Sequence, residues 1–375
     1  MKLCVLTDFN FPHVKGGGEV RIHEIARRLV KDGVDVTILS MRLRGVEDAE
    51  EVDGVRVVHI GPRVRNPPKR NVIQFAHYML SALYYLLKNS FDAIEANTYV
   101  PLIPAFIATR FRDVPLFATV HDVYRNEWSG QYPGWLAGIV EWILLKIPYD
   151  RILTVSLSTR NILVHEYGVS EDKINIVPNG VDLSYVDSLN VKAPVKKSII
   201  FVGRLISHKH VDDLIRAFGM IIPEFPGVTL KVVGSGAERR KLEAMTSHMG
   251  LEDNVSFMGV LDNDDVIREI KNSTLLVLPS TREGFGIVLA EAGACGKPVV
   301  AYKSGGVVEV VEEGVNGFLV EPRDVDALAG RIKELLSDDR LSREMGSAGR
   351  SRVEQYFTWD IAASKVLILL KKQLQ

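Results

Sequence analysis

The sequence predicts an α/β protein that consists of two Rossmann-like, doubly wound domains facing each other across a cleft. Short β-rich segments alternate with helical patterns along all 375 residues, and this alternation is typical of βαβ units in a mostly parallel sheet. The polar, proline-containing segment 189–198 interrupts the alternation, and a second series of strands begins after it. We therefore expect an N-terminal domain over residues 1–188 and a C-terminal domain over residues 189–356.

The first domain is expected to contain a series of strands separated by helices. The strands are KLCVLTDF (2–9), VDVTILS (34–40), VRVVHI (55–60), FDAIEAN (91–97), LFATVHD (116–122) and DRILTVS (150–156). Between the first two, Ile22, Ile25, Ala26 and Leu29 recur at the spacing of one helix face, which predicts an amphipathic helix there.

The second domain repeats this organisation. Its expected strands are SIIFVG (198–203), VTLKVVG (228–234), VSFMG (255–259), TLLVLPS (274–280) and KPVVAY (297–302). In open α/β sheets, ligands bind beyond the carboxyl ends of the strands. With two such domains, the cleft between them is the expected binding site.

Charge and cysteine content exclude several classes of protein. The formal net charge is −1, and the halves are balanced, with 21 basic and 22 acidic residues over 1–187 and 25 of each over 188–375. This argues against a nucleic-acid-binding protein, whose domain is normally basic. Cys4 and Cys295 suggest neither a disulfide framework nor a metal site. The sequence shows no signal-peptide pattern and no apolar segment of the roughly 18 residues that span a bilayer, so we expect a cytoplasmic protein, with a peripheral position at the cytoplasmic face of the membrane as the alternative.

Two features of the first domain are candidates for ligand binding. Gly17 and Gly18 belong to GGGEV (16–20), which connects the first strand to the first helix. Glycines there let backbone N–H groups approach a phosphate, although the spacing is not that of the dinucleotide fingerprint and a flexible loop is the alternative. His121 ends a strand and should face the cleft, but a single histidine is more often structural.

The segment GRLISHK (203–209) follows the first strand of the second domain. It would place Arg204 and Lys209 at the mouth of the sheet, an arrangement suited to a diphosphate. Surface cations are common, however, and the pattern alone is not specific.

The segment REGFGIVLAE (282–291) lies at the expected transition from a strand to a helix. If the helix begins near Phe285, its free N–H groups can hold a phosphate or sugar oxygen. Glu283, just before the helix, could accept hydrogen bonds from sugar hydroxyls. Glu291, two turns further on in apolar surroundings, needs a partner such as ribose hydroxyls. The alternative is a helix-capping acid followed by an ordinary helical glutamate.

Taken together, these motifs resemble the family-4 glycosyltransferases, retaining enzymes of the GT-B fold, over nearly the whole chain. The pair of glutamates separated by seven residues is the most specific part of the resemblance. The other motifs, in order, are GGGE, HD (121–122), TVS (154–156), VPNGVD (177–182), FVGRL, VVGSG, SGG (304–306) and NGFLV.

The resemblance implies a role for each candidate residue. Those implied in catalysis are His121, Arg204, Lys209 and Glu283. Those implied in donor binding are Gly17, Gly18, Phe285, Gly286, Ile287 and Glu291. The cations would neutralise the leaving diphosphate, Glu283 would face the donor sugar, and the Phe285–Ile287 amides would lie near sugar and phosphate. Glu291 would bind the ribose, and His121 would lie near the 6-position of the donor sugar.

The implied reaction transfers a hexosyl group from a nucleoside-diphosphate sugar, most simply a UDP- or GDP-sugar, to an acceptor hydroxyl with retention of configuration. The acceptor would be a glycan, a lipid-linked glycan or a glycolipid bound by the first domain, and the second domain would bind the donor. No cofactor and no metal are expected, because Arg, Lys and a helix dipole would take the place of the metal. The resemblance also implies that a last helix, over residues 357–375, packs back on the first domain.

Two departures from the family pattern lie beside Lys209. His208 stands where an acid is frequent, and His210 stands where a glycine is frequent. The alternatives are another GT-B enzyme, such as a sugar-nucleotide epimerase, and a non-catalytic sugar-nucleotide-binding protein.

A basic segment in the first domain raises the question of membrane contact. Residues 61–71 carry four cations and no acid, and the apolar segments VIQFAHYMLSALYYLLK (72–88) and WLAGIVEWILLKIP (135–148) follow. One interpretation is a basic, aromatic rim that contacts anionic lipid. The other is a buried helix beside a solvated loop.

Overall fold

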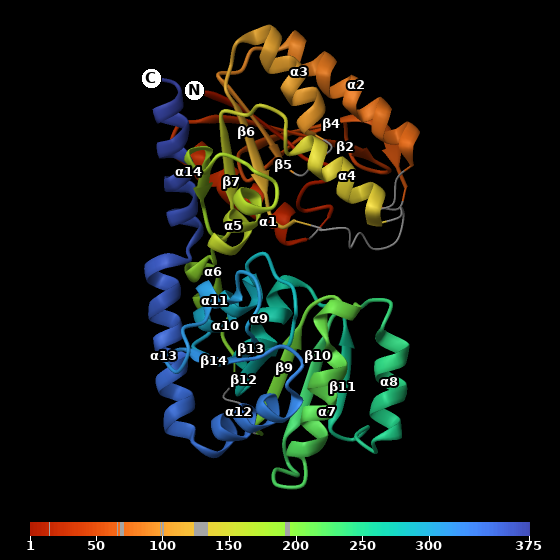
Figure 1. Cartoon of the computed structure of the whole chain (residues 1–375), viewed down its shortest axis with the longest axis vertical. Coiled ribbons are helices and arrows are strands. Elements are labelled where there is room, and N and C mark those ends of the chain that lie inside the picture. Colours follow the sequence, from red (N-terminus) through yellow and green to blue (C-terminus); the bar gives the residue numbers. More distant parts are fainter. Residues whose placement is uncertain are drawn as a thin grey trace. The chain divides into compact units, whose positions relative to one another are not determined.

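The computed structural model describes residues 1–14, 16–65, 67, 71–97, 99, 101–123, 134–191 and 196–375, with the side chains of 134–137 left out. The chain divides into two compact units (Figure 1). The first comprises Met1–Asn179 together with Trp359–Gln375, and the second comprises Gly180–Thr358. Each unit is an α/β structure around its own sheet, which confirms the predicted fold class.

The first unit contains an eight-stranded sheet with the order β3-β4-β2-β1-β5-β6-β7-β8. Neighbouring strands are parallel except for β3, which pairs antiparallel with β4. The central strand, β1, is almost entirely buried, as expected for a parallel sheet covered on both faces. The strands are β1 (Lys2–Leu6), β2 (Asp35–Leu43), β3 (Ala49–Val52), β4 (Val55–Val64), β5 (Ala93–Asn97), β6 (Leu116–Val120), β7 (Arg151–Thr154) and β8 (Ile174–Ile176).

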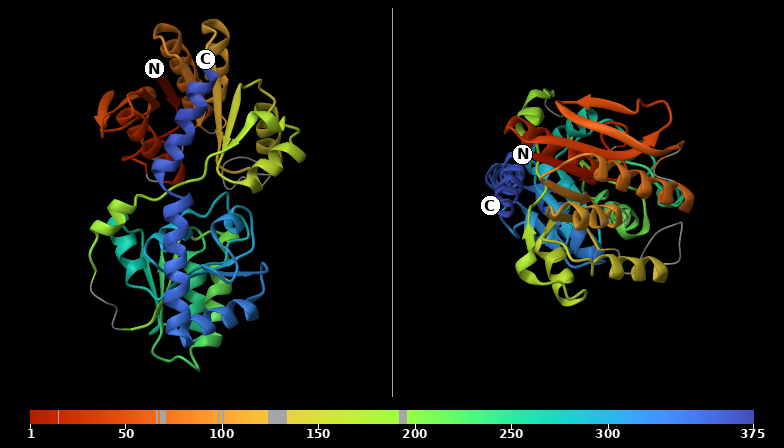
Figure 2. Two further views of the ribbon diagram at one scale, coloured as in Figure 1. Left: turned by 90° about the vertical axis from the view of Figure 1, so that its left-hand side faces the viewer. Right: turned by 90° about the horizontal axis from the view of Figure 1, so that it is seen from above.

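The helices of the first unit include the last helix of the chain. They are α1 (Gly17–Lys31), α2 (Val72–Lys88), α3 (Leu102–Arg112), α4 (Gly134–Leu144), α5 (Leu157–His165), the 3₁₀ turn η1 (Glu171–Lys173) and α14 (Trp359–Gln373). Helix α14 packs on α1 (Figure 2), where Arg28 Nε donates to Asp360 Oδ1 at 2.8 Å. The same helix buries Trp359, Ala363 and Val366, so it forms part of the core of this unit.

Helix α2 is apolar almost all round, yet it buries only one face. An Asn71–Gln74 capping box starts it, and Tyr78, Ala82 and Leu86 form the buried stripe. The opposite side is solvent-exposed; Ile73, for example, is 79% exposed. The interpretation of this segment as a buried helix therefore holds for one face of α2 only. Residues 66 and 68–70 of the basic segment before it lie outside the described part of the chain.

The second unit contains a six-stranded, fully parallel sheet with the order β11-β10-β9-β12-β13-β14. Its strands are β9 (Ser198–Val202), β10 (Thr229–Val233), β11 (Val255–Gly259), β12 (Leu275–Leu278), β13 (Val299–Tyr302) and β14 (Gly317–Val320). Its helices are α6 (Leu183–Ser188), η2 (Ser207–Lys209), α7 (Val211–Ile221), α8 (Arg239–His248), α9 (Asn263–Lys271), α10 (Ile287–Ala294), α11 (Val307–Val310), α12 (Val325–Ser337) and α13 (Asp339–Tyr356).

The chain passes from the first unit to the second between residues 179 and 180, which is earlier than the expected boundary at 188/189. Residues 180–188, including α6, belong to the second unit because their polar contacts are made there. Arg350 holds Asp187 through two hydrogen bonds of 2.7 and 2.8 Å. Lys271 Nζ donates to the carbonyl oxygens of Val186 and Leu189 at 2.7 and 2.8 Å. The chain returns to the first unit between residues 358 and 359, two residues later than expected.

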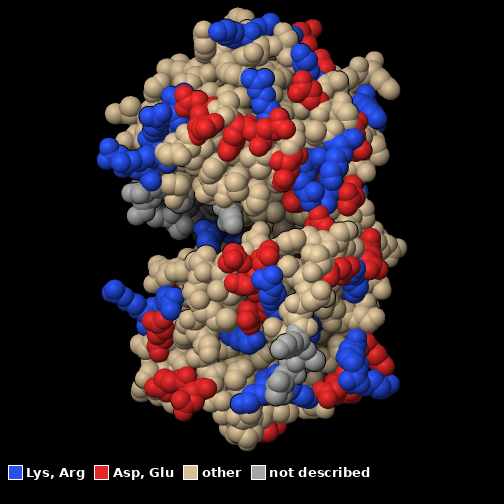
Figure 3. All heavy atoms as spheres, turned by 180° about the vertical axis from the view of Figure 1, so that it is seen from behind, with Lys and Arg blue, Asp and Glu red and all other residues tan. Residues whose placement is uncertain are grey.

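The surface agrees with the balanced charge of the sequence. On the face drawn in Figure 3, basic and acidic side chains are intermixed over both units. Within the described residues, no helix combines the length and the apolar character needed to cross a membrane.

Candidate functional site

Three loops at the carboxyl edge of the second sheet form or support the part of the predicted site that precedes α10. They follow β9, β12 and β13, which are neighbours in the sheet order. The loop after β9 contains Arg204 and Lys209, and the loop after β12 contains Glu283 and Phe285. Because parallel strands end at one edge of the sheet, these loops lie together where open α/β sheets bind their ligands.

Lys209 and Glu283 are in direct contact. Lys209 Nζ donates to Glu283 Oε1, and the two side chains are only 14% and 13% exposed. The backbone reinforces this junction, because Thr281 N donates to His208 O at 3.0 Å. The cation and the acid that the sequence predicts to act on opposite parts of the donor therefore form one ion pair.

The neighbourhood of His208 is electropositive. Burial lowers the pKa of its imidazole from the ordinary value, and the nearby cations Lys209 and Arg282 lower the pKa further. Arg204 adds a smaller effect of the same sign, with Glu283 acting in the opposite direction. The Arg204 side chain is exposed and has no hydrogen-bond partner among the described residues. This edge of the sheet is thus suited to an anion such as a diphosphate.

Helix α10 begins two residues later than the sequence suggested, at Ile287 instead of Phe285. Gly286 caps the helix with φ = 82°, a left-handed conformation that disfavours other residues. The Phe285 side chain is 3% exposed and packs edge-to-face on Phe357, with ring centroids 5.4 Å apart. Only the backbone of Phe285 is therefore suited to contact a ligand.

The SGG loop after β13 supports the backbone of the Glu283 loop. Gly306 N donates to Glu283 O at 2.9 Å. A Cβ added at Gly305 would lie 2.1 Å from Glu283 O, and one at Gly306 would lie 2.2 Å from Gly284 O. The sequence showed only a tight turn here, but the close backbone approach requires both glycines.

Glu291 lies in the second turn of α10, partly buried. Burial raises the pKa of its carboxyl to about 7. No group within the described part of the chain forms a hydrogen bond or ion pair with this carboxylate. The side chain is therefore free to accept hydrogen bonds from a ligand.

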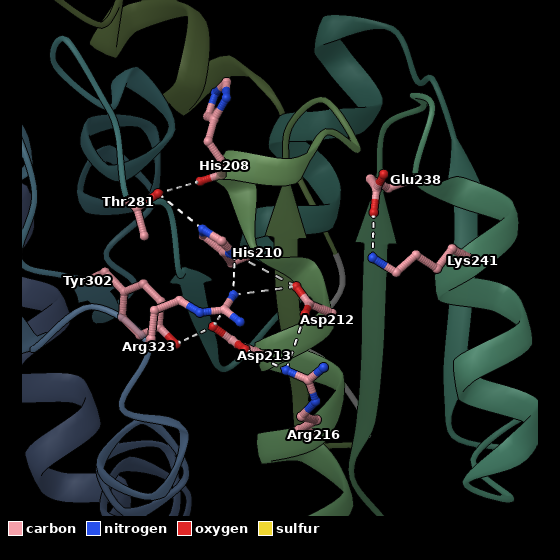
Figure 4. Close-up of polar contacts among 10 residues, drawn as sticks. All are labelled: His208, His210, Asp212, Asp213, Arg216, Glu238, Lys241, Thr281, Tyr302 and Arg323. Atoms are coloured by element: carbon pink, nitrogen blue, oxygen red, sulfur yellow. Dashed lines mark hydrogen bonds and ion pairs between the residues drawn. The ribbon is translucent and has the colours of Figure 1, made fainter. Parts of the chain in front are cut away.

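A polar network behind the Lys209 loop was missed by sequence reasoning (Figure 4). His210 connects β9 to α7 with φ = 45°. Its Nε2 lies 3.1 Å from Thr281 Oγ1, and its Nδ1 contacts Arg323 Nη1. Arg323 also pairs with the buried Asp213, 3.0 Å away, which accepts a 2.8 Å hydrogen bond from Tyr302.

This network joins the start of α7 to the loops after β12 and β14. It therefore fixes the backbone that carries Lys209. The only signal in the sequence was the departure itself, a histidine where the family pattern favours glycine.

The remaining predicted residues lie in the first unit. Gly17 and Gly18 are the first two residues of α1, which Gly16 caps, so they belong to a helix N-terminus and not to a free loop. A Cβ at Gly18 would lie 3.6 Å from Nε2 of His121, the residue after β6. This Nε2 is buried without a hydrogen-bond partner among the described residues. Burial, with a smaller contribution from Arg21, lowers the pKa of His121 to about 3, so its imidazole is neutral.

Two family models match the chain in succession. The model described as glycosyltransferase family 4 matches residues 15–185, and the model described as glycosyl transferases group 1 matches residues 190–352. The chain belongs to the glycosyltransferases that these two models describe.

The chain also aligns with curated proteins and solved structures over almost its full length. It is 27% identical to an uncharacterised glycosyltransferase of Methanocaldococcus jannaschii, with 99% of this chain and 98% of the relative covered. It is 26% identical to a glycogen synthase of Mycobacterium tuberculosis, with 96% and 92% covered.

The structural comparisons establish the fold. A sucrose-phosphate synthase from Thermosynechococcus elongatus superposes with a TM-score of 0.86 at 23% identity, covering 99% of this chain and 98% of that one. HepE from Anabaena, in complex with UDP-glucose, gives a TM-score of 0.80 at 23% identity, covering 99% and 100%. The fold is GT-B, with two Rossmann-like domains.

Proposed function

We propose that the chain is a retaining hexosyltransferase that uses a nucleoside-diphosphate sugar, with UDP- and GDP-sugars as the first candidates. The acceptor is a hydroxyl of a glycan, a lipid-linked glycan or a glycolipid. The observation that carries this proposal is the Lys209–Glu283 pair in an electropositive loop cluster at the carboxyl edge of the second sheet. The complex of HepE with UDP-glucose, on the same fold, supports a nucleotide-sugar donor.

The charges of the second unit suit departure of a diphosphate. Negative charge gathers on this leaving group as the glycosidic bond breaks, and Arg204 and Lys209 offer fixed positive charge to stabilise it without a metal. Preorganised donors of this kind typically contribute roughly 2.7–4 kcal/mol each to lowering the barrier. Glu283 then faces the donor sugar, where positive charge develops, and Glu291 accepts hydrogen bonds from the ribose hydroxyls.

Retention requires the acceptor oxygen to attack from the face that the diphosphate leaves. The bond from the anomeric carbon to the acceptor oxygen forms as the bond to the phosphate oxygen breaks. The acceptor proton passes to a phosphate oxygen, so no enzyme nucleophile is needed. In this scheme, neutral His121 accepts or donates a hydrogen bond at the 6-position of the sugar, and the Gly17–Gly18 amides contact the phosphate or the acceptor.

Glu283 provides the direct test. Glu283→Ala should abolish sugar transfer while nucleotide binding stays measurable by calorimetry. A variant with unchanged turnover would overturn the site assignment. Glu252→Ala, on the exposed surface of the same unit, is a matched control.

The donor can be identified by a thermal-shift panel of nucleoside diphosphates and their sugars. A ligand that binds only the folded state stabilises it by about 2.7 kcal/mol at a hundredfold excess over its dissociation constant. The true donor should therefore raise the melting temperature more than other nucleotides. A uniform response across the panel would contradict nucleotide-sugar specificity.

We further propose that the first unit contacts anionic lipid through α2 and α4. Ile73, Leu80 and Tyr84 of α2 are 79%, 68% and 67% exposed, and Trp142 and Ile143 of α4 are 51% and 54% exposed. Exposed cations flank α2, namely Arg63, Arg65 and Lys88. An apolar face with basic flanks is typical of interfacial helices.

Co-sedimentation with vesicles that contain anionic lipid tests this contact. Binding at low salt that weakens at high salt is expected, and Ile73→Ser with Leu80→Ser should reduce it. Absence of binding at low salt would rule the contact out.

A further inference from the structure

A cluster of two histidines and one glutamate lies in the first unit, apart from every residue assigned above. His13 comes from the segment before α1, Glu50 from β3 and His59 from β4. Glu50 Oε1 lies 2.7 Å from His13 Nε2 and 2.9 Å from His59 Nε2. One ligand atom from each residue lies within 4.8 Å of the others.

The strand register explains how two of these groups meet. In the antiparallel β3–β4 pair, Glu50 is opposite Val57. His59 is two residues further along β4, so it projects on the same face as Val57 and is a diagonal neighbour of Glu50. His13 then approaches the same carboxylate oxygen from the segment that leads to α1, and its ring lies edge-on to that of His59.

The surroundings of His59 are compatible with those of a metal ligand. Its side chain is fully buried, and each ring nitrogen faces an acceptor: Nδ1 lies 3.4 Å from Met41 O, and Nε2 faces Glu50 Oε1. A neutral imidazole carries one N–H and one lone pair, so the ring can donate through one nitrogen and act as a metal ligand through the other. If Nδ1–H donates to Met41 O, then Nε2 is left with a lone pair directed at the cluster. Donation of the second ring N–H to a backbone carbonyl is the usual arrangement of metal-bound histidine.

We propose that His13, Glu50 and His59 form a binding site for a zinc-like divalent metal ion. Two imidazole nitrogens and one carboxylate match the ligands that Zn²⁺ takes, whereas Mg²⁺ and Ca²⁺ prefer sets made only of oxygen. His13 and Glu50 are 26% and 23% exposed, so solvent reaches the cluster and water can fill the fourth position of a tetrahedral ion.

The site has a structural consequence for the start of α1. His13 lies three residues before Gly16, which caps the helix that begins with Gly17 and Gly18. An ion bound to all three side chains ties this segment to the β3–β4 pair. The metal therefore anchors the approach to α1, and none of its three ligands is a residue proposed for the donor chemistry.

Metal titration of the chelator-treated, full-length protein tests the site. We expect one equivalent of Zn²⁺ by calorimetry, and one equivalent of Co²⁺ with visible d–d absorption bands of a four- or five-coordinate nitrogen and oxygen set. His13→Ala changes a partly exposed side chain, so the variant should fold, and it should bind either ion at least tenfold more weakly. Glu50→Gln keeps the side-chain volume and should weaken binding to a similar extent.

The control is His165→Ala, which removes an exposed histidine of α5 in the same unit. This variant should keep the full stoichiometry and affinity. The proposal is overturned if the wild type binds no ion, or if His13→Ala and Glu50→Gln bind as the wild type does. Failure of the Glu283→Ala test would leave this result untouched, because the metal readout does not depend on sugar transfer.

Discussion

Lys209 donates a hydrogen bond to Glu283, although the two residues are 74 positions apart in the sequence. This contact makes each residue a partner of the other as well as a candidate ligand of the donor. Removing one of them therefore leaves a partly buried charge unpaired, and it also removes the proposed contact to the substrate.

The first prediction concerns Lys209→Met. The variant loses a cation proposed to stabilise the diphosphate, and it leaves the mostly buried Glu283 carboxylate without its ion-pair partner. We therefore expect kcat/KM to fall by about 100- to 1,000-fold. Steady-state kinetics with the identified donor measure this loss. Lys303→Met, which removes a long-range surface pair with Glu321 (3.5 Å), should change kcat/KM less than twofold. Equal losses in the two variants would contradict the assignment.

The second prediction concerns the pH dependence caused by Glu291. Its pKa is about 7 in the folded protein and 4.5 ordinarily, so the folded state binds the proton more tightly. The carboxyl therefore lowers stability increasingly as pH rises from about 4.5 to 7, by at most about 1.4 kcal/mol per pH unit.

Glu291→Gln should remove this dependence. Urea unfolding at pH 5 and pH 8 should show the glutamine variant gaining stability relative to the wild type at the higher pH. The same variant should bind nucleoside diphosphate more weakly, because the ribose hydroxyls lose a charged acceptor. A stability difference that is the same at both pH values would refute the raised pKa.

The third prediction concerns Gly306→Ala. The new Cβ would lie 2.2 Å from Gly284 O and 2.8 Å from Phe285 Cα, so the backbone of the Glu283 loop must shift. Overpacking of this kind costs roughly 1–3 kcal/mol. Denaturant unfolding and donor affinity should both decline. Gly330→Ala in α12, where the added Cβ meets nothing within 4 Å, should instead be neutral or stabilising.

The fourth prediction compares two substitutions at His210. Both remove the contacts with Thr281 and Arg323, but only the alanine variant keeps a side chain at φ = 45°. A left-handed conformation costs an L-residue roughly 1–2 kcal/mol relative to glycine. His210→Gly should therefore be more stable than His210→Ala by about that amount in urea unfolding. Equal stabilities would show that the backbone conformation at this position carries no cost.

The sequence predicted the parts of the fold that depend on local apolar patterns. Strands such as KLCVL and LLVL are short, buried and apolar, and their alternation with amphipathic helices indicated the two parallel sheets. Strand β3, with the sequence AEEV, has no such pattern, because it pairs at the edge of the sheet with one neighbour only. The crossing at residue 180 depends on contacts such as Arg350–Asp187, which join positions 163 apart and leave no local signal.

The candidate site shows the same division. Its residue types and spacing were visible in the sequence, since Glu283 and Glu291 belong to one motif. The Lys209–Glu283 pair, the support of Glu283 by the SGG backbone and the His210–Arg323 network were not visible. Each of these contacts depends on side chains or backbone groups that lie far apart in the sequence and follow different strands. A local sequence pattern therefore does not show that they meet.

The return of α14 to the first unit has a consequence for how the chain is made. Residues 180–358 are contiguous, so a ribosome delivers the whole second unit before it delivers α14. The first unit therefore lacks the helix that covers α1 until residues 359–373 have emerged, and Arg28 has no Asp360 to pair with until then, because the two are 332 positions apart. The core of the first unit is therefore completed only after the whole second unit has been synthesised.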